Sequence, residues 1–359
     1  MHIRLARYAI GALLLCALGA AAVPAAKERD PMSTPAAEAK SGAASQLVSI
    51  AGTGANLVAV GRRGVILMSA DAGKSWKQVP SPVSADLTSI RFSDAAHGWI
   101  TGHDAVVLRS RDGGKSWSRM LDGATALKLL QGAYGPQGAT PESTIAQDAD
   151  RAAAQSATPG VLPYPLLDAW FSTPDQGFVA GAFGLLFRTE DGGVTWTPWL
   201  ERSENKKMNH IYAISGGPGA LYLAGEQGFL RKLDAAGGQF TTVTTPYEGS
   251  FFGMYTADGV ALAHGLRGNA YISRDGGAAW TKVNTGVSAN IIAALPGQAN
   301  DLVLVSQAGD VLSLQGEAVH SLPAKRGAEV YGAAAVGKVL VTTGLGGARA
   351  QAIAALSDH

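Results

Sequence analysis

One short phrase recurs along the chain and limits what it can fold into. The pattern Ser/Thr-x-Asp-x-Gly-x-x-Trp appears four times, as SADAGKSW, SRDGGKSW, TEDGGVTW and SRDGGAAW. Its aspartates and tryptophans are Asp71, Asp112, Asp191, Asp275, Trp76, Trp117, Trp196 and Trp280. A worn copy at Asp234 keeps an aspartate, a glycine and an aromatic residue. Such self-similarity predicts a repeated structural unit.

The spacing of the aspartates gives the length of that unit. The step from Asp71 to Asp112 is roughly 40 residues, a common length for one structural repeat. The step from Asp191 to Asp275 is twice as long and holds two units, with Asp234 near the middle. The step from Asp112 to Asp191 exceeds one unit by nearly the length of another, yet it contains no further copy of the phrase. We therefore expect a regular repeat with a single insertion.

Within one unit the hydrophobic pattern predicts four short strands, at residues 87–92, 98–101, 105–109 and 117–120. Four antiparallel strands in a unit of this length are typical of a propeller blade. We predict an all-β fold, a seven-bladed β-propeller of four-stranded antiparallel blades over residues 45–357. Six or eight blades are the alternatives. The blades are expected to begin near residues 46, 87, 167, 211, 251, 291 and 330.

Three segments stand apart from the repeat. Residues 1–26 combine Arg4 and Arg7, an apolar run and small residues, which predicts a signal peptide for export. Residues 27–44 are rich in Ala, Pro and Glu and are expected to be a disordered linker. The insertion at 121–165 is expected to be helical, over 126–130 and after a capping box at Thr144, and to cover part of the ring; a mobile excursion is the alternative.

The composition excludes several kinds of site. The formal net charge is +1, with no basic run that would indicate nucleic-acid binding. Cys16 is the only cysteine and lies in the predicted signal peptide, so disulfides and cysteine chemistry are not expected in the mature chain. No cofactor and no metal site is predicted.

The recurring phrase is best explained as a turn between the third and fourth strands of a blade. The aspartate is expected to accept backbone N–H bonds from two and three residues on, the glycine to adopt a positive φ, and the tryptophan to pack against the neighbouring blade. A calcium or sugar site at each aspartate is the alternative. One carboxylate per turn is too few for calcium, which takes six to eight oxygen ligands.

The phrase and its neighbours resemble a known family. Ser/Thr-x-Asp-x-Gly-x-x-Trp is the Asp-box of bacterial neuraminidase repeats, and its combination with the motifs at 58–64, 177–184, 246–253 and 264–268 resembles the photosystem II stability/assembly factor-like family. The likeness covers roughly residues 46 to 346. It implies a seven-bladed, non-catalytic, chaperone-like factor on the lumenal side of the membrane, with an arginine-rich patch. Arg62, Arg63 and Arg267 are what this sequence offers for such a patch.

The turns between the second and third strands should lie on the face opposite the Asp-boxes. Most are Gly-x-x-Gly segments, typical of tight two-residue hairpins whose middle residues project. These projecting residues form the candidate partner-binding face: Arg62, Arg63, His103, Asp104, Phe183, Glu226, Gln227 and Arg267.

We expect a protein-interaction scaffold that assists assembly or stability of a membrane protein complex, by its resemblance a photosystem or, in other relatives, a transporter. The expected location is the periplasm, or the thylakoid lumen side in a photosynthetic host. No nucleic acid or small-molecule substrate is expected. The alternative is a carbohydrate-active propeller of the sialidase kind, or a sugar-binding module. Against catalysis, the Arg-Ile-Pro motif of sialidases is absent, and Tyr247 and Glu248 are adjacent on a strand and therefore point apart.

Overall fold

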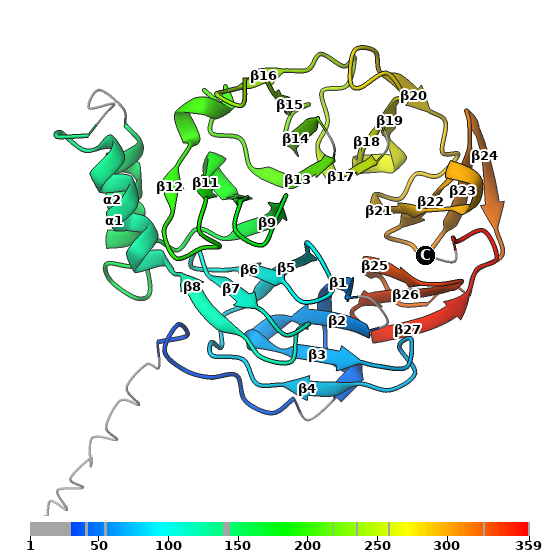
Figure 1. Ribbon diagram of the computed structural model, residues 1–359, viewed down its shortest axis with the longest axis horizontal. Helices are drawn as coiled ribbons and strands as arrows, with labels where there is room; N and C mark the ends of the chain where they lie inside the picture. The colour runs from blue at the N-terminus through cyan, green and yellow to red at the C-terminus, as the bar shows by residue number, and fades with distance from the viewer. Residues whose placement is uncertain are drawn as a thin grey trace, which may run out of the picture.

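Seven antiparallel sheets follow one another along the chain and stand around a central axis as the blades of a propeller (Figure 1). The computed structural model describes residues 30–39, 42–53, 56–138, 144–217, 219–234, 236–257, 259–325 and 327–357. The predicted signal peptide, residues 1–26, lies outside the described residues. The predicted seven-bladed propeller is confirmed.

The first four blades each contain four strands in sequence order, with the first strand of each nearest the axis (Figure 1). Blade 1 comprises β1 (Leu47–Thr53), β2 (Asn56–Gly61), β3 (Ile66–Ser69) and β4 (Lys77–Val79). Blade 2 comprises β5 (Leu87–Phe92), β6 (Gly98–Gly102), β7 (Val107–Ser110) and β8 (Ser118–Leu121). Blade 3 comprises β9 (Leu166–Phe171), β10 (Gly177–Gly181), β11 (Leu186–Thr189) and β12 (Thr197–Pro198). Blade 4 comprises β13 (Ile211–Gly217), β14 (Ala220–Gly225), β15 (Leu230–Leu233) and β16 (Phe240–Thr242).

The last three blades complete the ring. Blade 5 comprises β17 (Phe251–Ala257), β18 (Val260–Gly265), β19 (Ala270–Ser273) and β20 (Thr281–Val283). Blade 6 comprises β21 (Ile291–Pro296), β22 (Leu302–Ser306), β23 (Val311–Gln315) and β24 (Ala318–Leu322). Blade 7 has three strands, β25 (Val330–Val336), β26 (Val339–Gly344) and β27 (Gly347–Ala352).

Apolar side chains fill the junctions between blades, which is where the core lies. Each strand alternates its side chains between two neighbouring blades, so a separate buried cluster forms at each junction. At the junction of blades 1 and 2, for example, Val58 and Ile66 pack with Ile90 and Leu108, all of them fully buried. The ring is therefore held together by seven similar interfaces.

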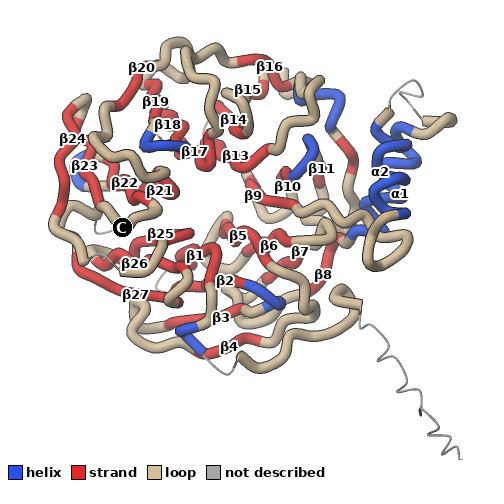
Figure 2. Tube along the Cα trace, turned by 180° about the vertical axis from the view of Figure 1, so that it is seen from behind, coloured by secondary structure: helices blue, strands red, loops and turns tan. Residues whose placement is uncertain are grey.

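The insertion between blades 2 and 3 forms two helices, α1 (Gly123–Tyr134) and α2 (Ile145–Ala154). They lie at the outer rim beside blades 2 and 3 and not over the centre of the ring, as both views show (Figures 1 and 2). The prediction that they cover part of the ring is therefore wrong. Small and apolar residues spaced along one face of each helix are buried against the rim, among them Leu130 and Ala149. The rim supplies the apolar surface that these helices need.

The caps of the two helices differ from the prediction, since the capping residue of α1 was not predicted and the predicted cap of α2 does not form. Asp122 caps α1 by accepting a hydrogen bond from the Thr125 N–H at 2.9 Å. Thr144, in contrast, makes no side-chain capping bond to α2, so the predicted capping box does not form.

No helix in the described part of the chain is long and apolar enough to cross a membrane.

Of the predicted linker the structure describes residues 30–39 and 42–44, and residues 30–39 run along the outer edge of blade 1. Met32 is 5% exposed and lies in the cluster between blades 1 and 2. The Ala39 N–H donates to Gln78 Oε1 of β4 at 2.7 Å, and the Ala36 N–H donates to the Ser81 carbonyl at 3.2 Å. The segment is ordered here because its backbone groups find partners on blade 1, which its Ala- and Pro-rich composition did not indicate.

Candidate functional site

The predicted partner-binding residues lie in the turns that join the second and third strands of blades 1 to 5. In each turn one residue has a left-handed backbone and, except in blade 2, a left-handed glycine follows it; in blade 1 these are Arg63 (φ 55°) and Gly64 (φ 73°). Two successive positive φ values are the signature of a type I′ turn, which matches the twist of the flanking strands. The turn therefore has its tip at the third residue of each four-residue segment, whereas the sequence had suggested that both middle residues project equally. The left-handed residues at the tips are Arg63, Asp104, Phe183, Gln227 and Arg267, and in blade 2 Ala105 (φ 51°) takes the place of the glycine.

The glycines of these turns are explained by close approach. A Cβ atom on Gly61 would lie 2.2 Å from the Gln46 carbonyl, in the link that enters the same blade. One on Gly64 would lie 2.0 Å from the Val83 carbonyl, in the link that enters the next blade. Each turn thus packs between the links that enter its own blade and the next one. A side chain in place of either glycine would clash with the backbone of one of these links.

A second contact ties three of these turns to the next blade. The Arg63 N–H donates to Asp86 Oδ1 at 2.8 Å, the Phe183 N–H to His210 Nδ1 at 2.9 Å, and the Arg267 N–H to Asn290 Oδ1 at 3.0 Å. Asp86, His210 and Asn290 are each the residue immediately before the first strand of the following blade. Sequence reasoning missed these residues, although a polar residue at that fixed position was the available signal. The face is consequently a rigid surface, because its turns are bonded to their neighbours.

The charged residues of the face are distributed around the ring. Arg62 lies 4.0 Å from Asp86, whereas Arg267 is on blade 5, so the arginines of blades 1 and 5 stand on blades that are not neighbours. Glu226 is occupied locally, since its carboxylate accepts the His210 N–H at 2.8 Å and the Tyr212 hydroxyl at 3.2 Å. Partial burial raises the pKa of Asp104, next to His103.

Aromatic side chains form a continuous row across this face. Phe183 lies 4.2 Å from Tyr164 and 4.7 Å from His210 between ring centroids. His210 contacts Tyr212 at 6.1 Å, and Tyr212 contacts Phe252 at 5.5 Å. The row leads from the link that follows α2 to the first strands of blades 4 and 5, which line the axis. We call these five residues the aromatic row.

Phe183 is the exceptional member of this row. It is 42% exposed, one of three large apolar side chains of the described residues that are so exposed, with Val194 and Leu345. Its φ of 54° is rare for a bulky residue and costs about 1–3 kcal/mol. The corresponding residues of the other turns are polar. The left-handed backbone is common to all five turns, so what distinguishes Phe183 is an exposed aromatic side chain at the tip of its turn.

A pocket of about 450 Å³ opens beside Phe183, between the rim and α2. Its walls are mainly apolar, with Asp148, Arg151 and Gln155 as the polar lining residues; the apolar ones include Leu130, Ile145, Ala149, Ala152, Tyr164, Phe183, Leu185, Leu200 and Met208. Lys206 and Lys207 are exposed in the turn that ends at Met208 and contact no carboxylate among the described residues. Tyr134 fixes the helices to this site, because its hydroxyl donates to Glu201 and accepts the Leu200 N–H at 3.1 Å. The pocket therefore belongs to a fixed part of the molecule.

The axis of the ring holds a second cavity, of about 350 Å³. In all seven blades a register shift follows the first residue of the innermost strand, and the residue skipped by the shift lines this cavity. β-Bulges re-aim side chains in this way. The residues so aimed are Val48, Thr88, Leu167, Tyr212, Phe252, Ile292 and Tyr331.

Arg91 and Asp168, which both line this axial cavity, form an ion pair. Asp168 is 2% exposed and accepts bonds from Arg91 Nε at 2.8 Å and Arg91 Nη2 at 3.0 Å. It also accepts the Ser89 hydroxyl at 2.8 Å and the Ile214 N–H at 3.1 Å. The carboxylate thus joins blades 2, 3 and 4, and both of its oxygens are used within the protein.

The Asp-boxes lie at the other end of the blades. In blade 1 the Asp71 carboxylate accepts the Ser75 N–H at 2.8 Å, the Ser75 hydroxyl at 2.6 Å and the Ser69 hydroxyl at 2.8 Å. These bonds lower the pKa of Asp71 to about 2. The main backbone donor is four residues on, instead of two or three, and the hydroxyl before the tryptophan was missed. Trp76 donates its indole N–H to the Gly73 carbonyl at 3.2 Å.

The aspartates that repeat this turn make the same contacts. Asp112 and Asp191 each accept from the residue four positions on, and Asp275 accepts N–H bonds from three and four positions on. The worn copy keeps one such bond, from the Gly238 N–H to Asp234 at 2.9 Å. Trp117, Trp196 and Trp280 pack into the clusters shared with the preceding blade. Every carboxylate is thus engaged within its own turn.

The tyrosines that a sialidase-like reaction would need are held in other ways. The Tyr247 hydroxyl donates to the Leu266 carbonyl at 3.1 Å, and its ring packs against Phe251. Tyr212 does contact a carboxylate, Glu226, but burial and that negative charge raise the pKa of Tyr212 to about 12. The raised pKa disfavours the tyrosinate, whereas Glu226 is placed to accept the hydroxyl proton, so this pair is the place to test for catalysis. Among the described residues no group of three or more His, Cys, Asp or Glu side chains could hold a metal ion.

Comparison with known proteins agrees with the resemblance noted in the sequence. The family model described as photosynthesis system II assembly factor YCF48 matches residues 47–126, which contain blades 1 and 2. The chain resembles the YCF48 assembly-factor family. No curated protein sequence matches the chain.

Solved structures show the same fold. YCF48 from Cyanidioschyzon merolae has a TM-score of 0.60 and 17% identity, covering 87% of this chain and 96% of its own. YCF48 bound to D1 peptide has a TM-score of 0.59 and 15% identity, covering 89% of this chain and 99% of its own. The computationally designed Ika8 protein has a TM-score of 0.58 and 13% identity, covering 87% of this chain and 98% of its own. At these identities the likeness establishes the propeller fold.

Proposed function

We propose that this protein is a non-catalytic scaffold that binds an unstructured segment of a membrane protein and assists assembly of its complex. The observation that carries the proposal is the strained, exposed Phe183 beside the apolar pocket of the insertion. Exposed aromatic side chains next to concave apolar surfaces are the usual anchors of protein interfaces. The YCF48 resemblance supports the same reading, since one solved YCF48 is bound to a D1 peptide.

The client by resemblance is a photosystem II subunit, and a transport complex is the alternative. Export by a signal peptide at residues 1–26 would place the protein in the periplasm, or on the thylakoid lumen side of a photosynthetic cell. The clients would then meet it from the outer side of the inner membrane or from the lumen. N-terminal sequencing of the exported protein tests this location, and we expect its first residue near Lys27.

The contact surface that we propose consists of the aromatic row and the pocket, with the second-to-third-strand turns around them. The pocket accepts an apolar side chain, and Lys206 and Lys207, which directly precede the lining residue Met208, favour an acidic neighbour in the client. Arg62 and Arg63 belong to the same face on blade 1. Each of these contacts is tested by substitution.

The experiment is crosslinking of the full chain to its client in native membranes, followed by identification of the client and measurement of its affinity. Phe183→Asn keeps a residue that tolerates the left-handed backbone but removes the aromatic ring. We expect at least tenfold weaker client binding, equal to about 1.4 kcal/mol. Val194→Asn is the matched control, because Val194 is equally apolar and 65% exposed but lies in an Asp-box turn.

Two results would overturn the proposal. One is a client that binds Phe183→Asn and the double variant Arg62→Glu/Arg63→Glu as tightly as the unchanged protein. The other is robust turnover of fluorogenic glycosides that is lost when Tyr212 or Glu226 is replaced, which would favour the carbohydrate-active alternative. We expect no turnover, because the Arg-Ile-Pro motif of sialidases is absent from the sequence.

A further inference from the structure

Blade 7 ends on a strand whose outer edge is open. β27 pairs with β26 on one side, and no described residue pairs its backbone with the other side. In each of the other six blades a fourth strand covers the third. β27 forms the outer boundary of its blade (Figure 1), and its residues 348–352 are exposed or half-buried. Unpaired N–H and C=O groups along an edge fit one kind of ligand, another extended polypeptide segment.

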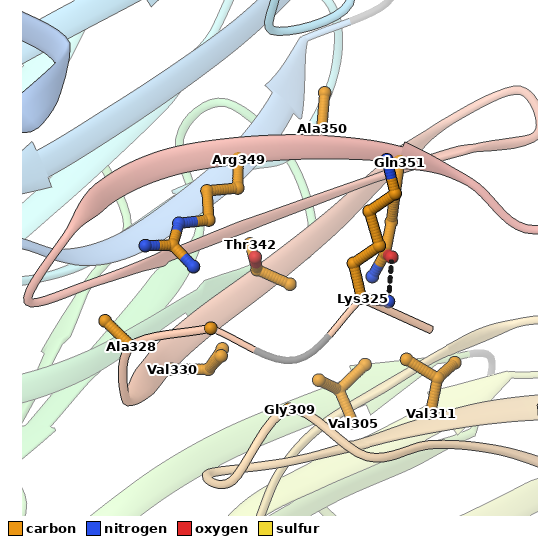
Figure 3. A pocket seen from close by; sticks show the side chains of 11 residues that line it. Val305, Gly309, Val311, Lys325, Ala328, Val330, Thr342, Arg349, Ala350 and Gln351 are labelled. Atoms are coloured by element: carbon orange, nitrogen blue, oxygen red, sulfur yellow. Dashed lines mark hydrogen bonds between the residues drawn. The ribbon is translucent and has the colours of Figure 1, made fainter. Parts of the chain in front are cut away.

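A cavity of about 430 Å³ lies beside this edge, between β27 and blade 6. Figure 3 shows Val305 and Val311 of blade 6 on one side of it, and Arg349 and Gln351 of β27 on the other. The link into blade 7 closes the cavity, because the Lys325 N–H donates to Gln351 Oε1 at 2.9 Å, drawn as a dashed line (Figure 3). A strand added at the edge would have every second side chain over this cavity.

Two cations at the cavity have no acidic partner among the described residues. Neither the Lys325 ammonium nor the Arg349 guanidinium contacts a carboxylate in that part of the chain. The Arg349 side chain extends from β27 towards the loop at Ala328 (Figure 3). A carboxylate on the added segment would meet both positive charges.

We propose that β27 receives an extended, acidic segment of the client as the fourth strand of blade 7, with a carboxylate placed against Arg349 and Lys325. The identity of the partner rests on the proposed function, whereas the site does not. Pairing with the β27 edge of a second copy is disfavoured, because antiparallel pairing of two such edges brings the two Arg349 side chains onto neighbouring strands, and like charges there destabilise a sheet.

The test tethers defined peptides at the edge. Cys16 is the only cysteine of the chain, so Ala352→Cys in a Cys16→Ser background gives a unique thiol at the end of β27. The probes are Cys-Gly-Gly-Thr-Val-Glu-Val-Thr-Val, the same peptide with Lys in place of Glu, and the Glu peptide N-methylated at alternate amides. The readout is the mercaptoethanol concentration that releases half of each disulfide-bound peptide. Val194→Cys in the same background is the control site.

At residue 352 we expect the Glu peptide to resist release to at least threefold higher mercaptoethanol than the other two peptides. The N-methylated peptide lacks backbone donors and the Lys peptide lacks the carboxylate, so each loses one of the two proposed contacts. Arg349→Ala should remove the difference between the Glu and Lys peptides but keep that between the Glu and N-methylated peptides. At residue 194 all three should be released together.

Equal release of the three peptides at residue 352 would overturn the inference. A concentration-dependent dimer with exchange-protected amides at 347–352 would also overturn it, since the edge would then belong to a second copy of the chain. Either result leaves the proposed function intact if the client still binds in a manner that depends on Phe183. Loss of that dependence would refute the proposed function without touching the peptide results at β27.

Discussion

Single residues in this protein are given their roles by what they face across a blade junction. His264 on β18 is an example, because its ring is 2% exposed and lies against Gly253, where a Cβ would be 2.1 Å from the imidazole. Its Nδ1 is 2.9 Å from the Ile291 carbonyl of blade 6, so this nitrogen carries the proton and donates. Burial lowers the pKa of His264 to about 4.

This lowered pKa predicts a loss of stability on mild acidification. The unfolded chain protonates His264 near pH 6.5 and the folded chain only near pH 4, so the free energy of unfolding should fall by about 3 kcal/mol from this residue as the pH drops between those values. Below pH 4 the residue adds no further loss. Urea unfolding at pH 7, 5 and 4 measures the effect.

His264→Asn provides the comparison, since an amide donor can reach the same carbonyl without titrating. We expect the variant to be less stable at pH 7 but to lose less stability than the unchanged protein between pH 6.5 and 4. Parallel pH profiles for the two proteins would show that His264 does not control this range.

At the scale of the element, the Asp-box turns of blades 3 and 5 each bind a side chain of the preceding blade. Arg109 of β7 is 5% exposed and donates from Nη1 to the Gly192 carbonyl, in the Asp-box of blade 3, at 2.8 Å. Lys232 of β15 donates in the same way to Gly276 of blade 5 at 2.6 Å. The turn therefore presents its backbone to a cation from the preceding blade.

Two glycines at equivalent positions of this turn allow its local backbone geometry and its contact with the preceding blade to be tested separately. Gly192 and Gly276 both have φ of +70°, but a Cβ on Gly192 would lie 2.0 Å from Arg109 Nη1, whereas one on Gly276 would meet nothing within 4 Å. We expect Gly276→Ala to lower the free energy of unfolding by about 1 kcal/mol, from backbone strain alone. Gly192→Ala should lower it by about 2–4 kcal/mol, since the buried guanidinium also loses its acceptor.

The chain already contains a precedent for the milder substitution. Ala72 occupies this position in blade 1, with φ of +56°. Thermal and urea unfolding of Gly192→Ala and Gly276→Ala measure the difference. Equal destabilisation of the two variants would mean that the Arg109 side chain moves away from residue 192 at no cost in stability.

On the scale of the whole molecule, the ring is closed by packing between blades and by a few polar links, with no shared strand among the described residues. Asp168 is the most connected of these links, because it joins strands of blades 2, 3 and 4. Residues 30–39 add a further strap along the outer edge of blade 1.

Asp168→Asn tests how much this link contributes. It removes the negative charge from Arg91, and we expect the free energy of unfolding to fall by about 2–4 kcal/mol, less than for a fully buried pair because the Arg91 side chain is 49% exposed. Glu317→Gln, in the exposed turn of blade 6, is the control for loss of one carboxylate. A change in Asp168→Asn no larger than in the control would show that apolar packing alone holds these blades.

The sequence by itself determined the repeat, and through it the architecture. A turn formed by an aspartate, a glycine and a tryptophan is a local structure, so its repeats can be recognised directly in the sequence. Their spacing predicted the seven blades and the strands of blade 2. The face carrying Arg62, Phe183 and Arg267 was also predictable, because alternate turns of an antiparallel blade open on the same side. These inferences needed only local geometry and period.

Tertiary structure alone decided which of those residues meet. His210 contacts Phe183 across a blade junction, and Arg91 contacts Asp168 from a distant part of the sequence. The helices of the insertion pack on the rim because apolar side chains of blades 2 and 3 are available there. The outer edge of β27 is unpaired because no fourth strand follows it in the described chain. Contacts between distant residues depend on the closure of the ring, and no local pattern encodes where the last blade will meet the first.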